Sequence, residues 1–353
     1  MNDHGGSAGL RLGAEPHRQV DFELPTAVSG RLRSAFTIAG RTIHLIVAGD
    51  QLGNALAHPF AHLPPGSETV EPDLTISAKD RSESGPPLID SYASGRAWNY
   101  RGHRVTASPD GRFVAHFIEQ SGSVWCLDRM TRRITGFAEG GDRLTLFERG
   151  KTAQLLLPFW LETQRLELIH AALIARNGRG VLVAGPNGAG KSTSALSCLI
   201  AGFDYLGDDY IVLEGNPHEG FQGHSVYGCA FLEPHHLPRF PALIPYAISG
   251  PYPSEVKRLV LLRQAYPAQL AASARLQFLL LPRIGSHPTA ITRATKAEAL
   301  RQLAPSSLLM LARPNAAALT RMATLVEQLD CFWLDLGPDI EAIPTLVEKL
   351  LDL

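Results

Sequence analysis

Residues 181–193 read VLVAGPNGAGKST, and this stretch decides the fold of the second half of the chain. Its spacing, GxxxxGKS over residues 185–192, is a complete P-loop. Glycines allow successive backbone N–H groups to converge on phosphate oxygens, and a helix that begins near Lys191 points the positive end of its dipole at the same place. An apolar strand at 181–184 precedes the loop, and an amphipathic helix at about 191–201 follows it. The stretch therefore predicts a nucleotide-binding α/β domain.

The residues of this loop divide into a charged group, a metal ligand and a backbone cradle. Lys191 is expected to place its charge on the β- and γ-phosphates, and the Ser192 hydroxyl is expected to complete a Mg²⁺ shell. We predict that the other nucleotide contacts come from the remaining positions, namely Gly185, Pro186, Asn187, Gly188, Ala189, Gly190 and Thr193. ATP and Mg²⁺ are therefore the expected cofactors, although the motif alone does not choose among ATP, GTP and pyrophosphate.

Two adjacent carboxylates follow the P-loop early in the chain. Asp208 comes 17 positions after Lys191, and Asp209 follows it. One helix, closed by Gly202, and one turn cover that distance, so we expect the pair on the strand next to the P-loop strand, near the γ-phosphate. The wording GPNGAGKST resembles that of ABC-transporter ATPases, but their LSGGQ signature and their later apolar strand ending in Asp-Glu are missing. The early acidic pair points to another class of P-loop protein.

The order of motifs between residues 169 and 213 resembles the HPr kinase/phosphorylase-like family. There the P-loop lysine is followed by a short helix, a glycine and a strand that carries Asp-Asp, and a histidine stands on the strand before the loop, as His170 does here. The GDD wording at 207–209 is also similar to that of ATP-dependent PEP carboxykinases, which share this nucleotide fold. The resemblance implies an α/β fold, with a P-loop kinase core of HPr kinase/PEP carboxykinase type and a smaller β-rich N-terminal domain.

The resemblance also implies a catalytic set of Lys191, Asp208 and His170. Asp208 would be the general base for an acceptor hydroxyl, and Asp209 would join Ser192 as a Mg²⁺ ligand. His170 would contact a phosphate or steer the aspartate; the alternative is a structural histidine hydrogen-bonded to the P-loop backbone. For the acidic pair, the alternative is a solvated strand end, although carboxylates this close to a P-loop would repel the nucleotide unless a metal lay between them.

Two departures from the family narrow the expected substrate. Thr193 follows Ser192 where the bifunctional HPr enzymes carry an acidic residue, and their downstream Glu-x-Arg-Gly-x-Gly signature is missing. The match is better to related kinases of peptide-modification settings, such as lasso-peptide kinases. The resemblance thus implies an enzyme that transfers phosphoryl from ATP, with Mg²⁺, to a serine or other hydroxyl on a peptide, protein or small molecule. The alternatives are a nucleotide-binding regulatory module without transfer activity and a P-loop ATP hydrolase.

Composition excludes several other classes. The chain has 353 residues, with 33 Lys+Arg against 34 Asp+Glu, so the formal net charge of −1 argues against a nucleic-acid partner. No run approaches the ~18 apolar residues that a membrane span needs, and the first residues lack the apolar core of a signal peptide. The four cysteines lie far apart, which is typical of a reduced, cytoplasmic protein. Because HPr-kinase-like proteins often form oligomers, a homo-oligomer is an open expectation.

A change of texture near residue 156 predicts two domains, 1–155 and 156–353, with residues 1–20 flexible. The first domain is expected to be β-rich and without chemistry; its predicted strands lie at 36–47, 74–76, 98–105, 112–118, 122–127 and 144–147. Asp110-Gly111 is a hairpin signal there. In the second domain we expect strands at 169–176, 181–184, 203–213, 255–263, 276–281 and 331–336, and helices at 158–169, 191–201, 296–303, 315–329 and 344–351.

A phosphotransferase needs cations beyond the P-loop lysine to neutralise charge in the transition state. The downstream sequence offers several basic residues without ranking them: His235, His236, Arg239, Lys257, Arg258, Arg283 and Arg313. We expect one of them to face the phosphates.

Overall fold

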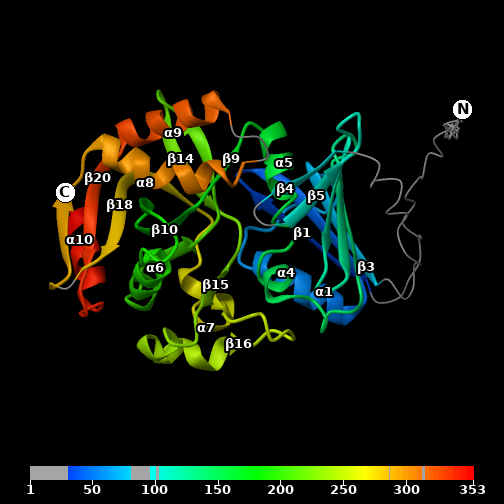
Figure 1. Ribbon diagram of the computed structural model, residues 1–353, viewed down its shortest axis with the longest axis horizontal. Coiled ribbons are helices and arrows are strands. Elements are labelled where there is room, and N and C mark those ends of the chain that lie inside the picture. Colours follow the sequence, from blue (N-terminus) through cyan, green and yellow to red (C-terminus); the bar gives the residue numbers. More distant parts are fainter. Residues whose placement is uncertain (1–30, 81–95, 101–102, 286, 312–314) are drawn as a thin grey trace, which may run out of the picture.

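The computed structural model describes residues 31–80, 96–100, 103–285, 287–311 and 315–353, which form a mixed α/β structure with three sheets. Figure 1 shows the sheet of the first part of the chain beside the larger sheet of the second part. The segment 1–20, which we expected to be flexible, lies outside the described residues.

The first sheet has eight strands among the described residues, in the order β1-β2-β3-β8-β7-β6-β5-β4. Strand β3 pairs parallel with β2 and with β8, and the remaining neighbours pair antiparallel. Side chains alternate between the two faces, so that Ile43, Leu45 and Val47 of β2 all enter the core. The strands are β1 (Arg31–Ile38), β2 (Arg41–Ala48), β3 (Leu74–Asp80), β4 (Arg96–Tyr100), β5 (His103–Ala107), β6 (Phe113–Ile118), β7 (Ser123–Asp128) and β8 (Arg133–Ala138), with α1 (Asp50–Ala57) and the 3-10 turn η1 (His58–Phe60) after β2.

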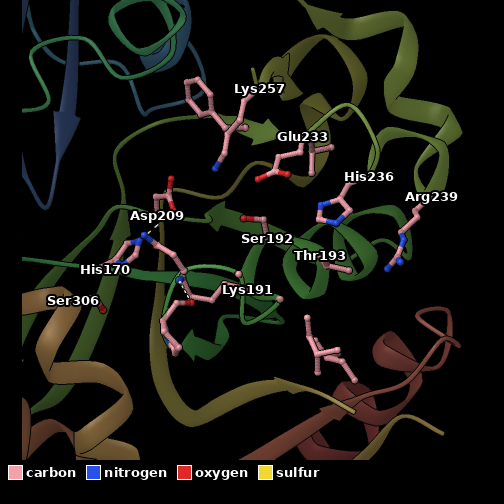
Figure 2. A pocket seen from close by; sticks show the side chains of 18 of the residues that line it. His170, Lys191, Ser192, Thr193, Asp209, Glu233, His236, Arg239, Lys257 and Ser306 are labelled. Atoms are coloured by element: carbon pink, nitrogen blue, oxygen red, sulfur yellow. Dashed lines mark hydrogen bonds and ion pairs between the residues drawn. The ribbon is translucent and has the colours of Figure 1, made fainter. Parts of the chain in front are cut away.

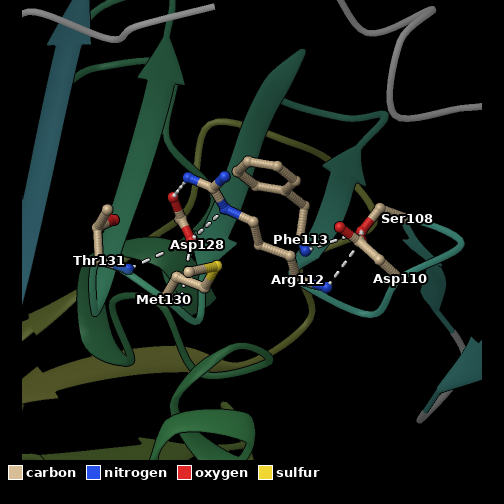
Figure 3. A network of polar contacts seen from close by, with 7 residues as sticks. All are labelled: Ser108, Asp110, Arg112, Phe113, Asp128, Met130 and Thr131. Carbon is tan, nitrogen blue, oxygen red and sulfur yellow. Dashed lines mark hydrogen bonds and ion pairs between the residues drawn. The ribbon is translucent and has the colours of Figure 1, made fainter. Parts of the chain in front are cut away.

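The expected hairpin at Asp110-Gly111 is confirmed between β5 and β6. Asp110 Oδ1 accepts hydrogen bonds from the backbone N–H of Arg112, at 3.1 Å, and from the Ser108 hydroxyl (Figure 3). Gly111 takes a φ of +73°, in the left-handed region that glycine adopts without strain. The Arg112 guanidinium then makes two hydrogen bonds, of 3.0 and 2.7 Å, to the carboxylate of Asp128 at the end of β7. Turn chemistry and an ion pair therefore hold this end of the sheet.

The predicted strand at 144–147 is wrong. The structure has a short helix there, α4 (Leu146–Gly150). Thr145 Oγ1 accepts from the backbone N–H of Glu148, at 3.2 Å, and Glu148 Oε2 accepts from the backbone N–H of Thr145, at 2.9 Å. This reciprocal pair is a capping box, which satisfies two N–H groups at the start of a helix. The Thr-x-x-Glu spacing at 145–148 indicates this helix start in the sequence, but the alternation of apolar residues at 144–147 favours a strand over the same positions.

The second sheet carries the P-loop. Its order in the described residues is β12-β10-β11-β18-β14-β13-β9, with β20 beside β18 and β19 beside β20. The P-loop strand β11 pairs antiparallel with β10 and parallel with β18. The strands are β9 (Glu167–Ile169), β10 (Ala171–Arg176), β11 (Arg179–Ala184), β12 (Asp204–Gly207), β13 (Ile211–Asn216), β14 (Gly220–Ser225), β18 (Ser273–Ile284), β19 (Ala290–Arg293) and β20 (Asp330–Leu336).

Helices cover both faces of this sheet. On one face α6 (Lys191–Ile200) and α10 (Ala342–Leu351) share a hydrophobic cluster with Ile174 and Val181. On the other face α8 (Lys296–Leu308) and α9 (Ala316–Gln328) share a cluster with Leu173 and Leu182 (Figure 1). Because neighbouring residues of β10 and β11 point to opposite faces, the nearly continuous apolar runs of these strands are all buried. The helices predicted at 191–201, 296–303, 315–329 and 344–351 are confirmed.

The acidic pair does not lie on a strand beside the P-loop strand, which corrects our expectation. Strand β12 pairs with β10, and β10 separates it from β11. Asp208 and Asp209 occupy the turn between β12 and β13. Gly207 has a φ of +157° before this turn, and β13 continues on the far side of β14 in the sheet. Strands β11 and β12 run in the same direction, because β10 pairs antiparallel with both of them. The turn after β12 and the P-loop after β11 therefore lie at the same end of the sheet.

A third, smaller sheet follows β14 and supplies another wall near the P-loop. Its strands, in the order β15-β17-β16, are β15 (Cys229–Leu232), β16 (Ala247–Ile248) and β17 (Arg258–Leu261). Strand β17 falls within the segment 255–263 where a strand was expected. Short helices lie around it, namely η2 (Leu237–Arg239), η3 (Pro241–Tyr246), α7 (Leu262–Ala265) and η4 (Pro267–Gln269).

Residues on both sides of the predicted domain boundary share one hydrophobic cluster. The cluster contains Trp125 of β7 from the first part of the chain. From the later chain it contains Leu156, Trp160 of α5 (Leu157–Thr163), Tyr210 and Leu259. The strands of the first sheet nevertheless end at Ala138, and those of the second begin at Glu167. The division at residue 155 stays a prediction. Within the described ranges, no helix combines the length and apolar character needed to cross a bilayer.

We expect the free energy of unfolding to fall as the pH drops from about 6.5 towards 4. Burial is the main reason that the pKa of His62 is lowered to about 4 and that of His116 to about 3, from an ordinary 6.5. The fold keeps both rings neutral, whereas the unfolded chain takes up protons throughout this window, so acid favours unfolding. Each pKa unit is worth about 1.4 kcal/mol.

Urea denaturation at about pH 7.5 and about pH 4.5 tests this expectation. His116→Leu is the matched variant, because the His116 Nε2 has no hydrogen-bond partner among the described residues. The leucine variant should lose less stability in acid than the parent protein. Equal acid sensitivity of the two proteins would contradict the assignment to His116.

Candidate active site

The P-loop joins the end of β11 to the start of α6. Gly188 and Gly190 take φ values of +79° and +107°, so that the backbone wraps around the space in front of the helix. The Lys191 ammonium donates hydrogen bonds to the carbonyl oxygens of Gly185, at 2.9 Å, and Pro186, at 3.1 Å. Lys191 is only 6% exposed, and burial lowers its pKa, while the nearby Asp209 carboxylate acts in the opposite sense. Its charge thus sits within the loop.

The loop opens into a cavity of about 1130 Å³. Most of the predicted nucleotide-binding residues line it, namely Pro186, Asn187, Gly188, Gly190, Lys191, Ser192 and Thr193, whereas Gly185 and Ala189 belong to the loop but not to the cavity wall. Other parts of the wall come from α4, the turn after β12, the end of β15, the end of α8, and the ends of β18 and β20. His170 and the downstream residues His236, Arg239 and Lys257 also line it (Figure 2). Parts of the chain that are far apart in sequence therefore meet around the P-loop.

Asp208 lies behind the cavity wall and close to the metal-ligand candidate of the P-loop. It is 3% exposed. Burial, and then the neighbouring Asp209 charge, raise the pKa of its carboxyl, although the Lys151 charge and then the Ser192 hydroxyl act to lower it. Asp208 Oδ2 has no hydrogen-bond partner among the described residues. A buried carboxylate oxygen with no partner, beside a hydroxyl, is a place where a cation would be stabilised.

Asp209 reaches into the cavity, and both of its oxygens are engaged. Its side chain is 29% exposed. The Lys151 ammonium donates to Oδ2. His170 Nε2 lies 3.3 Å from Oδ1, and Figure 2 shows the two side chains together. Burial alone would raise the pKa of Asp209, but the Lys151 charge and the His170 hydrogen bond hold it well below the ordinary value. In the adjacent pair, Asp209 is therefore the ionised carboxylate and Asp208 the one that takes a proton first.

His170 lies between β9 and β10 and is 8% exposed. Of the roles considered from sequence, its side-chain contact matches the one that steers an aspartate, because its ring nitrogen meets Asp209 rather than the P-loop backbone. Burial lowers the pKa of its imidazole, so the ring is neutral near pH 7. Its backbone N–H donates to Ser307 Oγ, at 3.1 Å, which fixes the residue against α8.

Lys151 is the site residue that sequence reasoning missed. It follows α4, in the half of the chain where we expected no chemistry, and it is 3% exposed. Its ammonium lies 4.8 Å from the centre of the Tyr210 ring and 4.7 Å from that of Phe231. The Asp209 charge raises its pKa despite burial, which acts in the opposite direction. Nothing in the local sequence marks this lysine, because its partner is 58 positions away.

The structure sorts the downstream basic residues. His236, Arg239 and Lys257 line the cavity, and Figure 2 shows the Lys257 side chain directed towards Asp209 and Ser192. Arg283 instead pairs with the Asp335 carboxylate, with Nη2 and Oδ2 3.2 Å apart, outside the cavity wall. His235 is exposed beside Glu233, Arg258 lies on β17 outside the cavity wall, and Arg313 lies outside the described residues.

The residues near the P-loop fit a magnesium ion but not a metal centre built by protein alone. In the part of the chain that the structure describes, no three or more His, Cys, Asp or Glu side chains gather as a ready ligand set. Mg²⁺ prefers oxygen ligands and is usually held by one or two carboxylates together with phosphate and water. The Ser192 hydroxyl and the partnerless Asp208 oxygen supply such donors. Any metal here would complete its shell with nucleotide phosphates.

No protein-family model and no curated protein matches this chain. Among solved structures, it is similar to the Hpr(Ser) kinase/phosphatase from Coxiella burnetii. That match has 12% sequence identity and a TM-score of 0.28, and it covers 53% of this chain and 94% of the other. A likeness this distant leaves the function to be argued from the residues of the site.

We expect Gly190→Ala to weaken ATP binding by tenfold or more. At φ +107° an L-residue is strained by about 1–2 kcal/mol, and a Cβ at this position would come within 2.2 Å of Leu336 Cδ1. Relief of that clash must move either the loop or the Leu336 side chain, which lines the same cavity. Gly178→Ala is the matched control: its φ of +74° gives similar strain, but nothing lies within 4 Å of the added Cβ. Titration calorimetry with ATP and Mg²⁺ compares the two, and equal affinities would show that the loop conformation does not govern binding.

Proposed function

We propose that this chain is a P-loop phosphotransferase of HPr-kinase-like type, which transfers the γ-phosphoryl group of ATP to a hydroxyl on a peptide, protein or small molecule. One observation carries the proposal: the P-loop lysine, Ser192 and the carboxylate of Asp209 line the same cavity, and Asp208 is buried behind its wall. A phosphate-binding loop alone would support nucleotide binding. A carboxylate held next to it adds a proton acceptor for an attacking hydroxyl.

Nucleotide binding follows from the charges and donors of the loop. The N–H groups at the start of α6 and the Lys191 ammonium would hold the β- and γ-phosphates. The Ser192 hydroxyl and the Asp208 carboxylate would hold Mg²⁺, which neutralises charge on the phosphates when it is bound. A volume of about 1130 Å³ exceeds the 300–1,000 Å³ of ordinary small-molecule pockets, which leaves room for part of an acceptor beside the nucleotide.

For the general base we propose Asp209 rather than Asp208, which exchanges the roles expected from sequence. A base must come within hydrogen-bonding distance of the proton that it takes, and this requirement precedes its pKa. Asp209 lines the cavity, whereas Asp208 is buried behind it against Ser192. As the acceptor oxygen bonds to the γ-phosphorus, the bond from that phosphorus to the bridging oxygen of ADP breaks and the hydroxyl proton passes to Asp209.

Lys257 is the cation best placed to balance the charge of the transferred group. It lines the cavity near the acidic pair, and no ion pair or hydrogen bond engages its side chain within the described ranges. Exposure leaves it free to move towards a phosphoryl group as the charge develops. Tyr210 follows Asp209 where an ATP hydrolase would carry a glutamate, and its hydroxyl is bonded to Gln154 at 2.8 Å.

The test is incubation with γ-labelled ATP, Mg²⁺ and a host-cell lysate, in parallel with single variants. We expect Asp209→Asn to keep its affinity for ATP and to lose transfer by about 10²-fold or more, the size of a general-base contribution. Lys191→Ala should lose nucleotide binding itself. Asp335→Asn removes a carboxylate outside the cavity wall and should leave both unchanged.

The remaining outcomes separate the alternatives. Asp208→Asn should raise the Mg²⁺ concentration needed for half-maximal transfer; a variant that needs no more Mg²⁺ yet transfers about 10²-fold more slowly would return the base to Asp208. Tight ATP binding by the parent protein without any labelled product would favour a regulatory module. Phosphate release that is independent of any acceptor would favour a hydrolase.

A further inference from the structure

The segment 145–154 is hydrogen-bonded to the first sheet and to two loops of the nucleotide-binding part of the chain. On the side of the first sheet, the Trp125 indole N–H of β7 donates to Glu148 Oε1 at 3.4 Å, and the Thr152 hydroxyl donates to the Leu56 carbonyl of α1 at 3.0 Å. Glu148 also closes the capping box of α4 and is 4% exposed. The segment is therefore fastened to the first part of the chain.

The same segment is fastened to the nucleotide-binding part. The Tyr227 hydroxyl donates to the Thr152 carbonyl at 2.9 Å, and the Tyr210 hydroxyl donates to Gln154 Oε1 at 2.8 Å. Tyr210 directly follows Asp209 in the sequence. The position of the acidic turn is thus coupled to the backbone that carries Lys151.

Lys151 has little freedom at this junction. Its ammonium is packed between the rings of Tyr210 and Phe231, with the Phe147 ring 5.7 Å away, and the residue is 3% exposed. Cation–π contacts stabilise a desolvated ammonium, but a buried charge still needs a partner of opposite sign. Asp209 supplies that partner. The rings keep the ammonium in place, and the ammonium in turn keeps Asp209 Oδ2 in place.

The consequence for Asp209 is a fixed carboxylate plane. Lys151 engages Oδ2 and His170 engages Oδ1, so rotation of the carboxylate would break both contacts. Lone pairs not used by these two donors remain for the cavity. Without Lys151, one oxygen would lose its anchor and the carboxylate could turn towards Lys191 or Lys257, both of which line the same cavity.

We propose that Lys151 is a positioning residue for phosphoryl transfer, supplied by the segment that connects the first sheet to the nucleotide-binding core, and that it acts by holding the carboxylate of Asp209 towards the acceptor hydroxyl. The inference rests on the proposed function. It makes the first sheet part of the catalytic apparatus, because the sheet holds α4 and α4 holds this lysine.

The experiment measures kcat and KM for ATP in the full chain for four variants: Lys151→Met, Lys151→Arg, Asp209→Asn and the double variant Lys151→Met/Asp209→Asn. Methionine keeps the volume of the lysine stem within the aromatic rings and removes the charge. We expect Lys151→Met to lower kcat by about 10²-fold, as displacement of a reacting group by about 1 Å does, with KM for ATP changed by less than about threefold. Lys151→Arg should recover part of the loss.

The double variant is decisive. If Lys151 acts through Asp209, Lys151→Met should slow Asp209→Asn no further. Multiplied losses, or a Lys151→Met variant with the parent kcat, would overturn the inference. Lys296→Met is the control for a structural role, because Lys296 donates to the carbonyls of Val326 and Glu327, both at 3.0 Å, far from the cavity wall. It should lower the melting temperature and leave kcat unchanged.

Failure of the proposed function gives a different result. If the parent protein transfers no label with any acceptor, the transferase itself is rejected before any variant is compared. If the parent transfers label and Lys151→Met lowers the melting temperature but keeps the parent kcat, as Lys296→Met should, the positioning role is rejected and the transferase stands.

Discussion

The burial of two adjacent carboxylates beside the glycine-rich loop at 185–192 is the constraint on which this site depends. Like charges so close cannot both stay ionised in a poorly solvated place without compensation. The structure supplies this compensation unevenly: Asp209 receives the Lys151 ammonium and the His170 ring. Burial and the Asp209 charge raise the pKa of Asp208, although the Lys151 charge and Ser192 act in the opposite direction. The result is one anionic group on the cavity side and one oxygen donor next to the P-loop serine.

This division of roles explains why the two parts of the chain are packed as they are. The charge that compensates Asp209 does not come from the sheet that carries the P-loop but from the end of α4, which Glu148 and Trp125 hold against the first sheet. A single hydrophobic cluster then runs through both parts. The sequence predicts no chemistry in the first part of the chain. The first sheet nevertheless holds the helix end that brings the Lys151 charge to Asp209.

Residue spacing predicted the loops, turns and helices that depend on interactions between neighbours in sequence. It did not predict the order of strands in a sheet or the contacts between distant segments. The P-loop, its strand and helix α6 follow from glycine spacing and apolar periodicity, and the hairpin at Asp110-Gly111 follows from turn chemistry. The prediction of a strand at 144–147 is wrong because apolar alternation there competes with the capping-box spacing of Thr145 and Glu148, which starts a helix. The acidic pair was placed on a neighbouring strand because the order of strands in a sheet does not follow from their order in the chain.

A reader of the sequence alone could derive the P-loop motif, the two carboxylates that follow it closely and the alternation of helices and strands around it, because each of these depends on residues within one turn, helix or strand. The tertiary structure alone decided which carboxylate faces the cavity, which of the downstream cations line it and that Lys151 joins the site. Those outcomes depend on burial and on charges brought together across long stretches of chain, and a pairing between residues 58 positions apart leaves no local pattern to read.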